Sequence, residues 1–237
     1  MNKIKAIAIK ELLFFSNSPF GYLYLLIVLT ISHWLFLSDF FVNNLSSYDS
    51  LFNNLYYLSI FFIPVITMNS LADEKKQANW EVILSLPVSD LELLIGKFLG
   101  ILIYSLTSLL LLAPAIVTVF ILGTPDIGIF FSQLIATILL FSAYISAGIF
   151  FSSLTSQPLL SFVYTFSLLL LNNLIVSQSV LSRFPPALAQ LFHFLSLSSR
   201  VSIVSSGLVD LTNIFFFFSW VSIFLIASSL ILKKRQI

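Results

Sequence analysis

Long apolar segments alternate with short polar ones along almost the whole chain. A transmembrane helix needs about 20 mostly apolar residues. Six segments meet that requirement: 20–37, 55–71, 98–122, 129–151, 158–176 and 214–232. Within these bounds no segment contains Asp, Glu, Lys or Arg. The pattern predicts an all-α integral membrane protein in which residues 1–237 form a single domain with six transmembrane helices.

Composition agrees with a membrane location. Hydrophobic residues make up 59% of the chain and charged residues 9%, whereas about 25% of residues are charged in a soluble domain. So few charges cannot cover a surface that faces water, and lipid is the expected surrounding. The formal net charge of +1 gives no reason to expect nucleic-acid binding. The lack of cysteine excludes disulfides, thiolate metal ligands and cysteine nucleophiles.

The N-terminal segment carries Lys3, Lys5 and Lys10 ahead of an apolar run, as a secretory signal does. That run continues through Leu37, and no small-residue cleavage site follows it. An uncleaved first span is therefore the better interpretation.

The distribution of basic residues predicts the orientation. Six spans place both termini on one side of the membrane, together with the segments 72–97 and 152–157. Nine of the 11 basic residues fall on that side: Lys3, Lys5, Lys10, Lys75, Lys76, Lys97, Lys233, Lys234 and Arg235. Only Arg183 and Arg200 fall on the other side. Because basic residues accumulate in cytoplasmic loops, we expect both termini in the cytoplasm and the chain in a cytoplasmic (inner) membrane of bacterial type.

Polar chemistry is concentrated in the loop between the second and third spans. The segment 73–97 holds eight of the chain's 21 charged residues (11 basic plus 10 acidic). Before Pro87, residues 77–86 have helix-forming composition. Trp80, Ile83 and Leu84 share one face of that helix by their spacing, and Glu81 lies on another. Such an amphipathic helix either lies on lipid headgroups or docks into a groove of a cytoplasmic partner, and the pattern alone leaves both open.

A second helix start follows Pro87. Ser89 and Glu92 have the spacing of a capping box, in which the serine caps the helix and the glutamate reaches back to the capping residue. Val88 and Leu93 occupy the positions of a hydrophobic staple. We therefore expect a helix that begins near Asp90 and continues into the third span.

Catalytic constellations are missing from the sequence. His33 and His193 are too few and too far apart for a zinc motif, and there is no glycine-rich phosphate loop or nucleophile elbow. The chain is therefore not expected to be an enzyme or to hydrolyse ATP. His33 and the asparagines 69, 172 and 173 are interpreted as helix-packing residues, with ligand roles as the alternative.

Short motifs along the chain resemble those of ABC-2 type transporter permeases, especially the branch of gliding-motility and nitrous-oxide-reductase-maturation permeases. They are Lys10-Glu11-Leu12, Ser18 to Tyr22, Glu74-Lys75-Lys76, Glu81, Leu86 to Ser89, Glu92, Gly96-Lys97 and Gly207 to Asp210. The resemblance covers nearly the whole chain. One departure is Ala78-Asn79, where family members often have Gly-Thr, which leaves the identity of the recognised ATPase open.

The resemblance implies an exporter in which two such subunits, identical or sister permeases, assemble with cytoplasmic ABC ATPase subunits. ATP and Mg²⁺ would bind to those partners, and this chain would need no cofactor. Residues 1–15 would form an interfacial helix, and 177–213 an extracytoplasmic segment. The helix at 77–86 would be the coupling helix that contacts the ATPase, through Trp80, Glu81, Ile83, Leu84 and Pro87. The alternative is a membrane scaffold that anchors cytoplasmic machinery without translocation; the substrate stays open.

Overall fold

The computed structural model describes residues 2–43, 48–76, 88–122 and 126–234, and within these ranges all regular structure is helical. The helices are α1 (Asn2–Asn17), α2 (Pro19–Asn43), α3 (Tyr48–Thr67), α4 (Ala72–Lys76), α6 (Asp90–Leu111), α7 (Ala113–Leu122), α8 (Ile127–Leu154), α9 (Pro158–Leu174), α10 (Gln178–Leu181), α11 (Pro186–Leu195), α12 (Leu197–Ser205) and α13 (Leu211–Lys234). The all-α membrane fold predicted from the sequence is confirmed.

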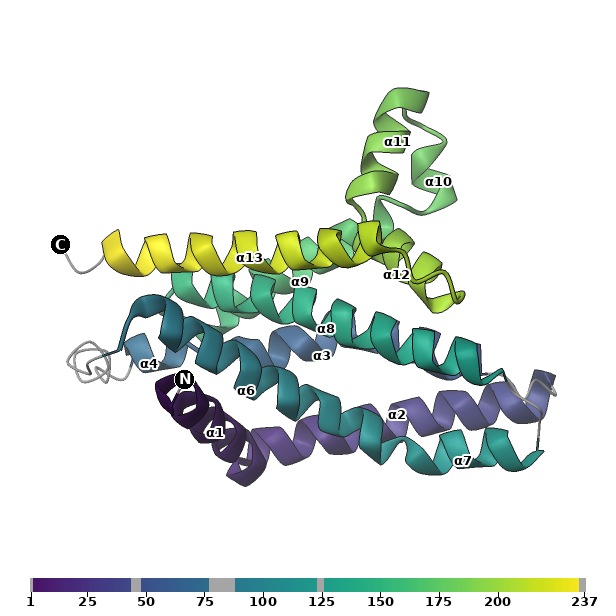
Figure 1. Ribbon diagram of the computed structural model, residues 1–237, viewed down its shortest axis with the longest axis horizontal. Coiled ribbons are helices and arrows are strands. Elements are labelled where there is room, and N and C mark those ends of the chain that lie inside the picture. Colours follow the sequence, from purple (N-terminus) through teal and green to yellow (C-terminus); the bar gives the residue numbers. More distant parts are fainter. Residues whose placement is uncertain (1, 44–47, 77–87, 123–125, 235–237) are drawn as a thin grey trace.

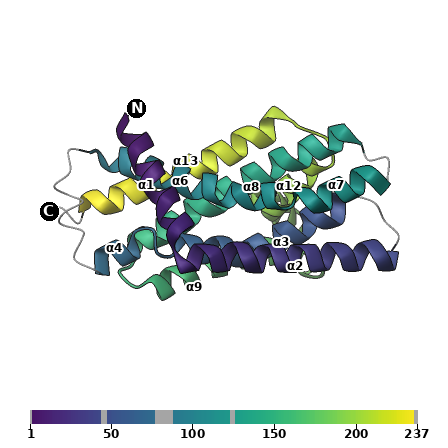
Figure 2. The same cartoon turned by 90° about the horizontal axis from the view of Figure 1, so that it is seen from below.

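The long helices α2, α3, α6, α8, α9 and α13 run along one direction as a bundle, and α1 crosses one end of it obliquely (Figures 1 and 2). Both termini, α4 and the start of α6 lie toward this same end. The helix α8 is central, because α3, α6, α9, α12 and α13 all pack against it. This arrangement brings the beginning and the end of the chain together with the charged loop.

Among the described residues, five helical stretches are long and apolar enough to cross a membrane, and a sixth candidate exists. The five are Pro19–Phe40, Tyr48–Lys75, Asp90–Leu122, Ile127–Leu154 and Leu211–Lys233. The helices α11 and α12 qualify only as a pair bent by 67°, and α11 projects away from the bundle (Figure 1).

The helix α9 is a better sixth span than the bent pair. Its 17 residues reach about 26 Å at 1.5 Å per residue, which is close to the hydrocarbon thickness. It also lies lengthwise against α3 and α8. We therefore assign the sixth crossing to α9; α12 packs against α8 and α9, and α10 and α11 project sideways from the bundle (Figure 1).

The third apolar segment is one predicted range, 98–122, but two helices in the structure. The helix α6 ends at Leu111, and α7 begins at Ala113. Pro114 lies in the first turn of α7, and its ring nitrogen cannot donate the helical hydrogen bond to Leu110. The chain therefore changes helix at Leu112, whose N–H instead donates to the carbonyl oxygens of Ser108 and Leu109.

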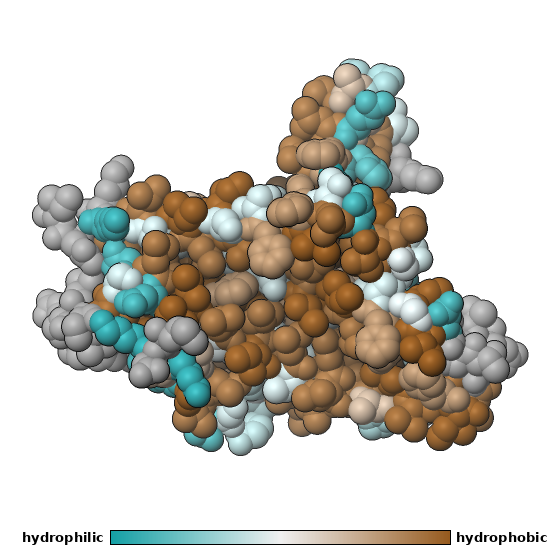
Figure 3. All heavy atoms as spheres, in the orientation of Figure 1, coloured by the Kyte–Doolittle hydropathy of each residue, from teal (hydrophilic) through white to brown (hydrophobic). Residues whose placement is uncertain are grey.

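Large apolar side chains cover the length of the bundle. Trp34, Leu110 and Ile121 expose about three quarters of their surface (74%, 75% and 74%). Figure 3 shows hydrophilic side chains gathered toward the two ends and on the α10–α11 projection, with an apolar face between them. Continuous exposure of this kind suits contact with lipid and is rare in a monomeric soluble protein.

Candidate functional site

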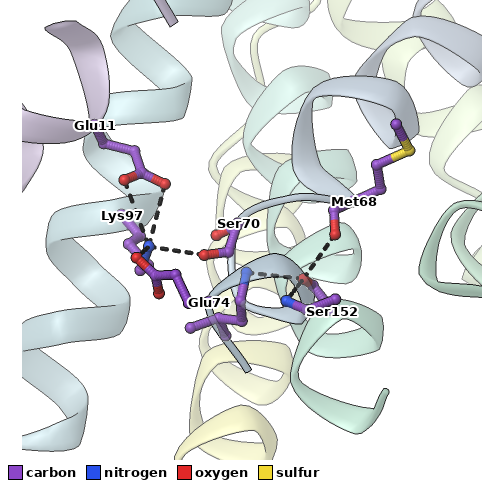
Figure 4. A network of polar contacts seen from close by, with 8 residues as sticks. Glu11, Met68, Ser70, Glu74, Lys97 and Ser152 are labelled. Atoms are coloured by element: carbon purple, nitrogen blue, oxygen red, sulfur yellow. Dashed lines mark hydrogen bonds and ion pairs between the residues drawn. The ribbon is translucent and has the colours of Figure 1, made fainter. Parts of the chain in front are cut away.

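A buried lysine lies at the bundle end that carries both termini. Lys97, in the second turn of α6, is 2% exposed. Its Nζ donates to the carbonyl oxygen of Ser70 at 2.7 Å and to Glu74 Oε1 at 2.9 Å. It also lies 3.3 Å from Glu11 Oε1 (Figure 4). A buried ammonium requires such partners because its desolvation is otherwise too costly.

Local capping sets the position of Lys97 along α6. Ser89 Oγ accepts a hydrogen bond from the N–H of Glu92 at 3.3 Å, and Glu92 Oε2 accepts one from the N–H of Ser89 at 2.9 Å. The capping box expected from the sequence is therefore present, and α6 starts at Asp90. Because α6 begins at Asp90, Lys97 lies on the side of α6 that faces residues 68–71, the corner between α3 and α4.

Two glycines allow α1 to approach α6 closely. A Cβ at Gly96 would lie 2.7 Å from the side chain of Ile7, and one at Gly100 would lie 2.7 Å from the carbonyl oxygen of Ala8. Real Cβ atoms do not tolerate such distances, so only glycine fits at both positions. Spacing of small residues by four is a common device for close helix packing in membranes. Here it brings Glu11 of α1 beside Lys97.

The helix α8 holds the same corner from the other side. Ser152 Oγ accepts hydrogen bonds from the N–H groups of Leu71 and Ala72, both at 3.0 Å, and donates to the carbonyl oxygen of Met68 at 3.1 Å (Figure 4). Lys75 of α4 donates to the backbone carbonyl of Ser153. The corner between α3 and α4 is thus bonded both to α6 and to α8.

The charge balance of this cluster is acidic. Glu11 and Glu74 share the single ammonium of Lys97, and Glu74 Oε2 and Ser70 Oγ are buried without hydrogen-bond partners among the described residues. Burial raises the pKa of Glu11 above its ordinary value, and this effect exceeds the opposing attraction of Lys97. An adjoining cavity of about 210 Å³ is lined by further residues of α1 and the corner, including Lys10, Asn69 and Asp73.

The cluster links helices. In the described part of the chain no group of three or more His, Cys, Asp or Glu residues could hold a metal ion. A buried ion pair adds little net stability, but removing one partner is costly. The arrangement therefore links α1, the α3–α4 corner and α6 into one bonded unit.

The predicted contact residues Trp80, Glu81, Ile83, Leu84 and Pro87 lie in 77–87, outside the described residues. The two helices that flank this segment are described. The helix α4 ends at Lys76, and α6 begins at Asp90. Both carry members of the Lys97 cluster, so the predicted coupling segment is flanked on each side by the linked unit.

The sequence reasoning missed this cluster. It assigned Lys97 to the cytoplasmic segment 72–97, on a helix expected to begin near Asp90, but did not predict that this lysine is buried. The missed signal was the lysine between two glycines four residues apart, Gly96 and Gly100, because that spacing indicates a second helix lying across the lysine.

The other polar residues singled out from the sequence have separate locations. His33 Nδ1 lies 3.0 Å from the carbonyl oxygen of Leu29, one turn earlier in α2. Asn172 accepts from the N–H of Leu197 at 3.0 Å and so supports the start of α12. Asn173 lines a cavity in the far half of the bundle, and Asn69 lines the cavity beside Lys97.

Comparison with known proteins gives one family. A family model described as ABC-2 family transporter protein matches residues 36–233. The match includes the 73–97 segment and α3 to α12, and it does not reach α1. A comparison with curated proteins finds no match. The match does not distinguish the gliding-motility or nitrous-oxide-reductase-maturation branch from the rest of the family.

Proposed function

The chain belongs to the ABC-2 family of transporter proteins, and from this premise we propose that it is a permease driven by a separate cytoplasmic ATPase in the direction of export. Membership makes the chain a membrane component of an ABC transporter rather than a catalytic subunit. In this proposal ATP and Mg²⁺ bind to the partner, which contacts the segment 77–87. Two copies of this chain, or one copy and a sister permease, complete the membrane part.

The observation that carries the proposal is the set of buried ion pairs and hydrogen bonds around Lys97. A force applied to the segment between α4 and α6 reaches Glu74 on one side and Lys97 on the other. Glu11 extends the link to α1, and Ser152 extends it to α8. Breaking a buried ion pair by loss of one partner costs roughly 3–5 kcal/mol. We therefore expect a displacement of the segment between α4 and α6 to move α1 and α8 with it rather than to break these contacts.

The direction of transport and the branch within the family rest on the sequence resemblance. The segments around Lys10, Glu74 and Gly207 resemble permeases of the gliding-motility and nitrous-oxide-reductase-maturation branch. We propose that the charged end faces the cytoplasm, because nine of 11 basic residues are assigned to that side.

The test is reconstitution with the ATPase encoded nearest to this chain. The complex is assembled in lipid vesicles, and ATP turnover and co-elution are measured for three variants. Trp80→Asp should prevent assembly, because a charge replaces the apolar centre of the predicted docking face. The charge-free triple variant Glu11→Gln/Glu74→Gln/Lys97→Met should assemble but lose the coupling between ATP turnover and transport. Lys5→Met, an exposed lysine of α1, is the matched control.

Normal assembly and transport in Trp80→Asp would contradict the docking assignment. A complex that assembles fully yet never moves any cargo in an ATP-dependent, vanadate-sensitive manner would instead support the scaffold alternative.

A further inference from the structure

The cavity beside the Lys97 cluster has a negatively charged lining. Its volume is about 210 Å³, and it lies among α1, the α3–α4 corner and α6. Three carboxylates and two ammonium groups line it: Glu11, Asp73, Glu74, Lys10 and Lys97. When all five are ionised, the lining carries one net negative charge, which disfavours an anionic occupant. The volume is below the roughly 300–1,000 Å³ of sites for drug-sized ligands, so it suits an ion with a few water molecules.

The ammonium group of Lys97 is fully used by its present partners. An ammonium group has three N–H donors. Those of Lys97 meet three acceptors: the carbonyl oxygen of Ser70 at 2.7 Å, Glu74 Oε1 at 2.9 Å and the carboxylate of Glu11, whose Oε1 is 3.3 Å away. Lys97 therefore has no donor left for any other oxygen atom of the cavity wall.

Two buried oxygen atoms of the cavity wall have no partner. Ser70 is 3% exposed, and its Oγ makes no hydrogen bond within the described part of the chain. Glu74 Oε2 is likewise buried and unpaired there. Both residues line the cavity, and their other oxygen atoms meet at the Lys97 ammonium, so the two unpaired atoms belong to one small region. Because buried polar groups are nearly always satisfied, these atoms indicate an occupant of that region.

The chemistry of these atoms favours a cation as the occupant. An ionised carboxylate oxygen only accepts, so Glu74 Oε2 needs a hydrogen-bond donor or a positive charge. A water molecule would donate, but it would leave the net negative charge of the lining in place. Hard cations take carboxylate, amide and hydroxyl oxygen ligands, and Glu74, Asn69 and Ser70 supply one of each here. One net negative charge matches a monovalent ion, and the described residues hold no larger set of carboxylates for a multivalent metal.

We propose that this cavity binds a monovalent alkali cation, Na⁺ or K⁺, through Glu74 Oε2 and Ser70 Oγ, with the amide oxygen of Asn69 and water as further ligands. The carboxylate of Glu74 then lies between two cations, with Oε1 on the Lys97 ammonium and Oε2 on the bound ion. The site belongs to this chain alone and does not depend on the ATPase-driven export proposed above. Its test therefore needs no ATPase, and its failure would leave that proposal intact.

The test measures cation binding to the purified full chain in an uncharged detergent. Binding of ²²Na⁺ is followed by scintillation proximity, with unlabelled NaCl, KCl and CaCl₂ as competitors. N-methyl-D-glucamine chloride at equal ionic strength is the control salt, because its bulky organic cation cannot be coordinated by these oxygen atoms. The Tm is measured in the same salts, and it also shows whether each variant is folded.

Three variants separate the site from its surroundings. Ser70→Ala removes only Oγ, which bonds to nothing in the described chain, so this variant should fold as the wild type does. Glu74→Gln removes one negative charge of the lining. Ser32→Ala is the matched control, because Ser32 is a fully buried serine of α2 whose Oγ is also unpaired but which lies outside the cavity.

We expect NaCl or KCl to displace ²²Na⁺ and to raise the Tm by about 3–6 °C at ten times the Kd, whereas N-methyl-D-glucamine chloride should do neither. Ser70→Ala should weaken binding about fivefold, the loss expected for one neutral polar contact. Glu74→Gln should abolish binding, and Ser32→Ala should leave it unchanged; if Glu74→Gln does not fold, Ser70→Ala decides alone.

Three results would overturn the proposal. The first is a wild type that neither binds ²²Na⁺ nor gains Tm in KCl, which would leave water as the partner of the two unpaired atoms. The second is unchanged binding in either folded cavity variant. The third is displacement of ²²Na⁺ by CaCl₂ at a lower concentration than by NaCl or KCl, which would contradict a monovalent ion.

Discussion

Glu11 and Lys97 are 86 positions apart in the chain, and their charged atoms lie 3.3 Å apart inside the structure. The pair joins the oblique helix α1 to the start of the third span. Glu74 joins the same ammonium from the α3–α4 corner. All three side chains are largely shielded from water. We therefore expect each substitution in this cluster to change the stability of the protein in a definite direction.

Replacing Lys97 by methionine should destabilise the protein strongly. The variant keeps the side-chain volume but leaves two carboxylates without their counter-ion, and loss of one partner of a buried ion pair costs roughly 3–5 kcal/mol. Thermal unfolding of the detergent-solubilised chain measures the effect. The charge-free triple variant should recover most of the loss, because neutral replacement of a whole buried cluster is often tolerated. A single variant as stable as the wild type would contradict the pairing.

Glu11→Gln should change the dependence of stability on pH. Burial raises the pKa of Glu11 above its ordinary value of 4.5, so the folded state holds this proton more tightly than the unfolded state. The stability from Glu11 is fully present below pH 4.5 and is lost as the pH rises through the folded pKa. The stability of the wild type should therefore fall relative to that of the variant as the pH rises from 4.5 through the folded pKa of Glu11, measured as the difference in Tm at each pH. A difference in Tm that does not change as the pH rises above 4.5 would refute the assigned shift.

Gly100→Ala should push α1 away from α6. The added Cβ would lie 2.7 Å from the backbone oxygen of Ala8, and overpacking of this kind typically costs about 1–3 kcal/mol. Gly128→Ala is the control, because its Cβ would meet only a side-chain oxygen of Asp126, at 3.1 Å. The Tm of both variants is compared with that of the wild type. Equal, small effects would argue against close contact between α1 and α6.

Ser152→Ala should weaken the bond between α8 and the α3–α4 corner. The change leaves the N–H groups of Leu71 and Ala72 without their acceptor, and a buried unsatisfied group costs roughly 1–3 kcal/mol. Ser142→Ala, on the same helix, is the matched control, because Ser142 bonds only to the carbonyl oxygen of Ile138 one turn earlier. Hydrogen exchange at the Leu71 and Ala72 amides should rise in the first variant and stay unchanged in the second.

The parts of the fold that depend on neighbouring residues were predictable from the sequence. The capping box joins Ser89 to Glu92 within one helical turn, so its residue types identify the helix start directly. The apolar segments were visible for a similar reason, since hydropathy is a property of consecutive residues. Their ends were less certain: α2 extends to Asn43, beyond the predicted end at residue 37.

The candidate site was not predictable in the same way, because it depends on packing between distant segments. Lys97 is polar in the sequence, and only the approach of α1 across Gly96 and Gly100 shows that it is buried. Asn172 and Asn173 were both interpreted as packing residues from the sequence. In the structure Asn172 accepts a hydrogen bond from the N–H of Leu197, 25 positions later in the chain.

The break at Leu112 gives the two halves of the third span different anchors. The inner half, α6, is fixed to α1 through Gly96 and Gly100. The outer half, α7, places the ring of Phe120 5.5 Å from Tyr48 at the start of α3 and 5.9 Å from Phe130 at the start of α8. The two parts of this span are therefore held by different neighbours, one on each side of the break at Leu112.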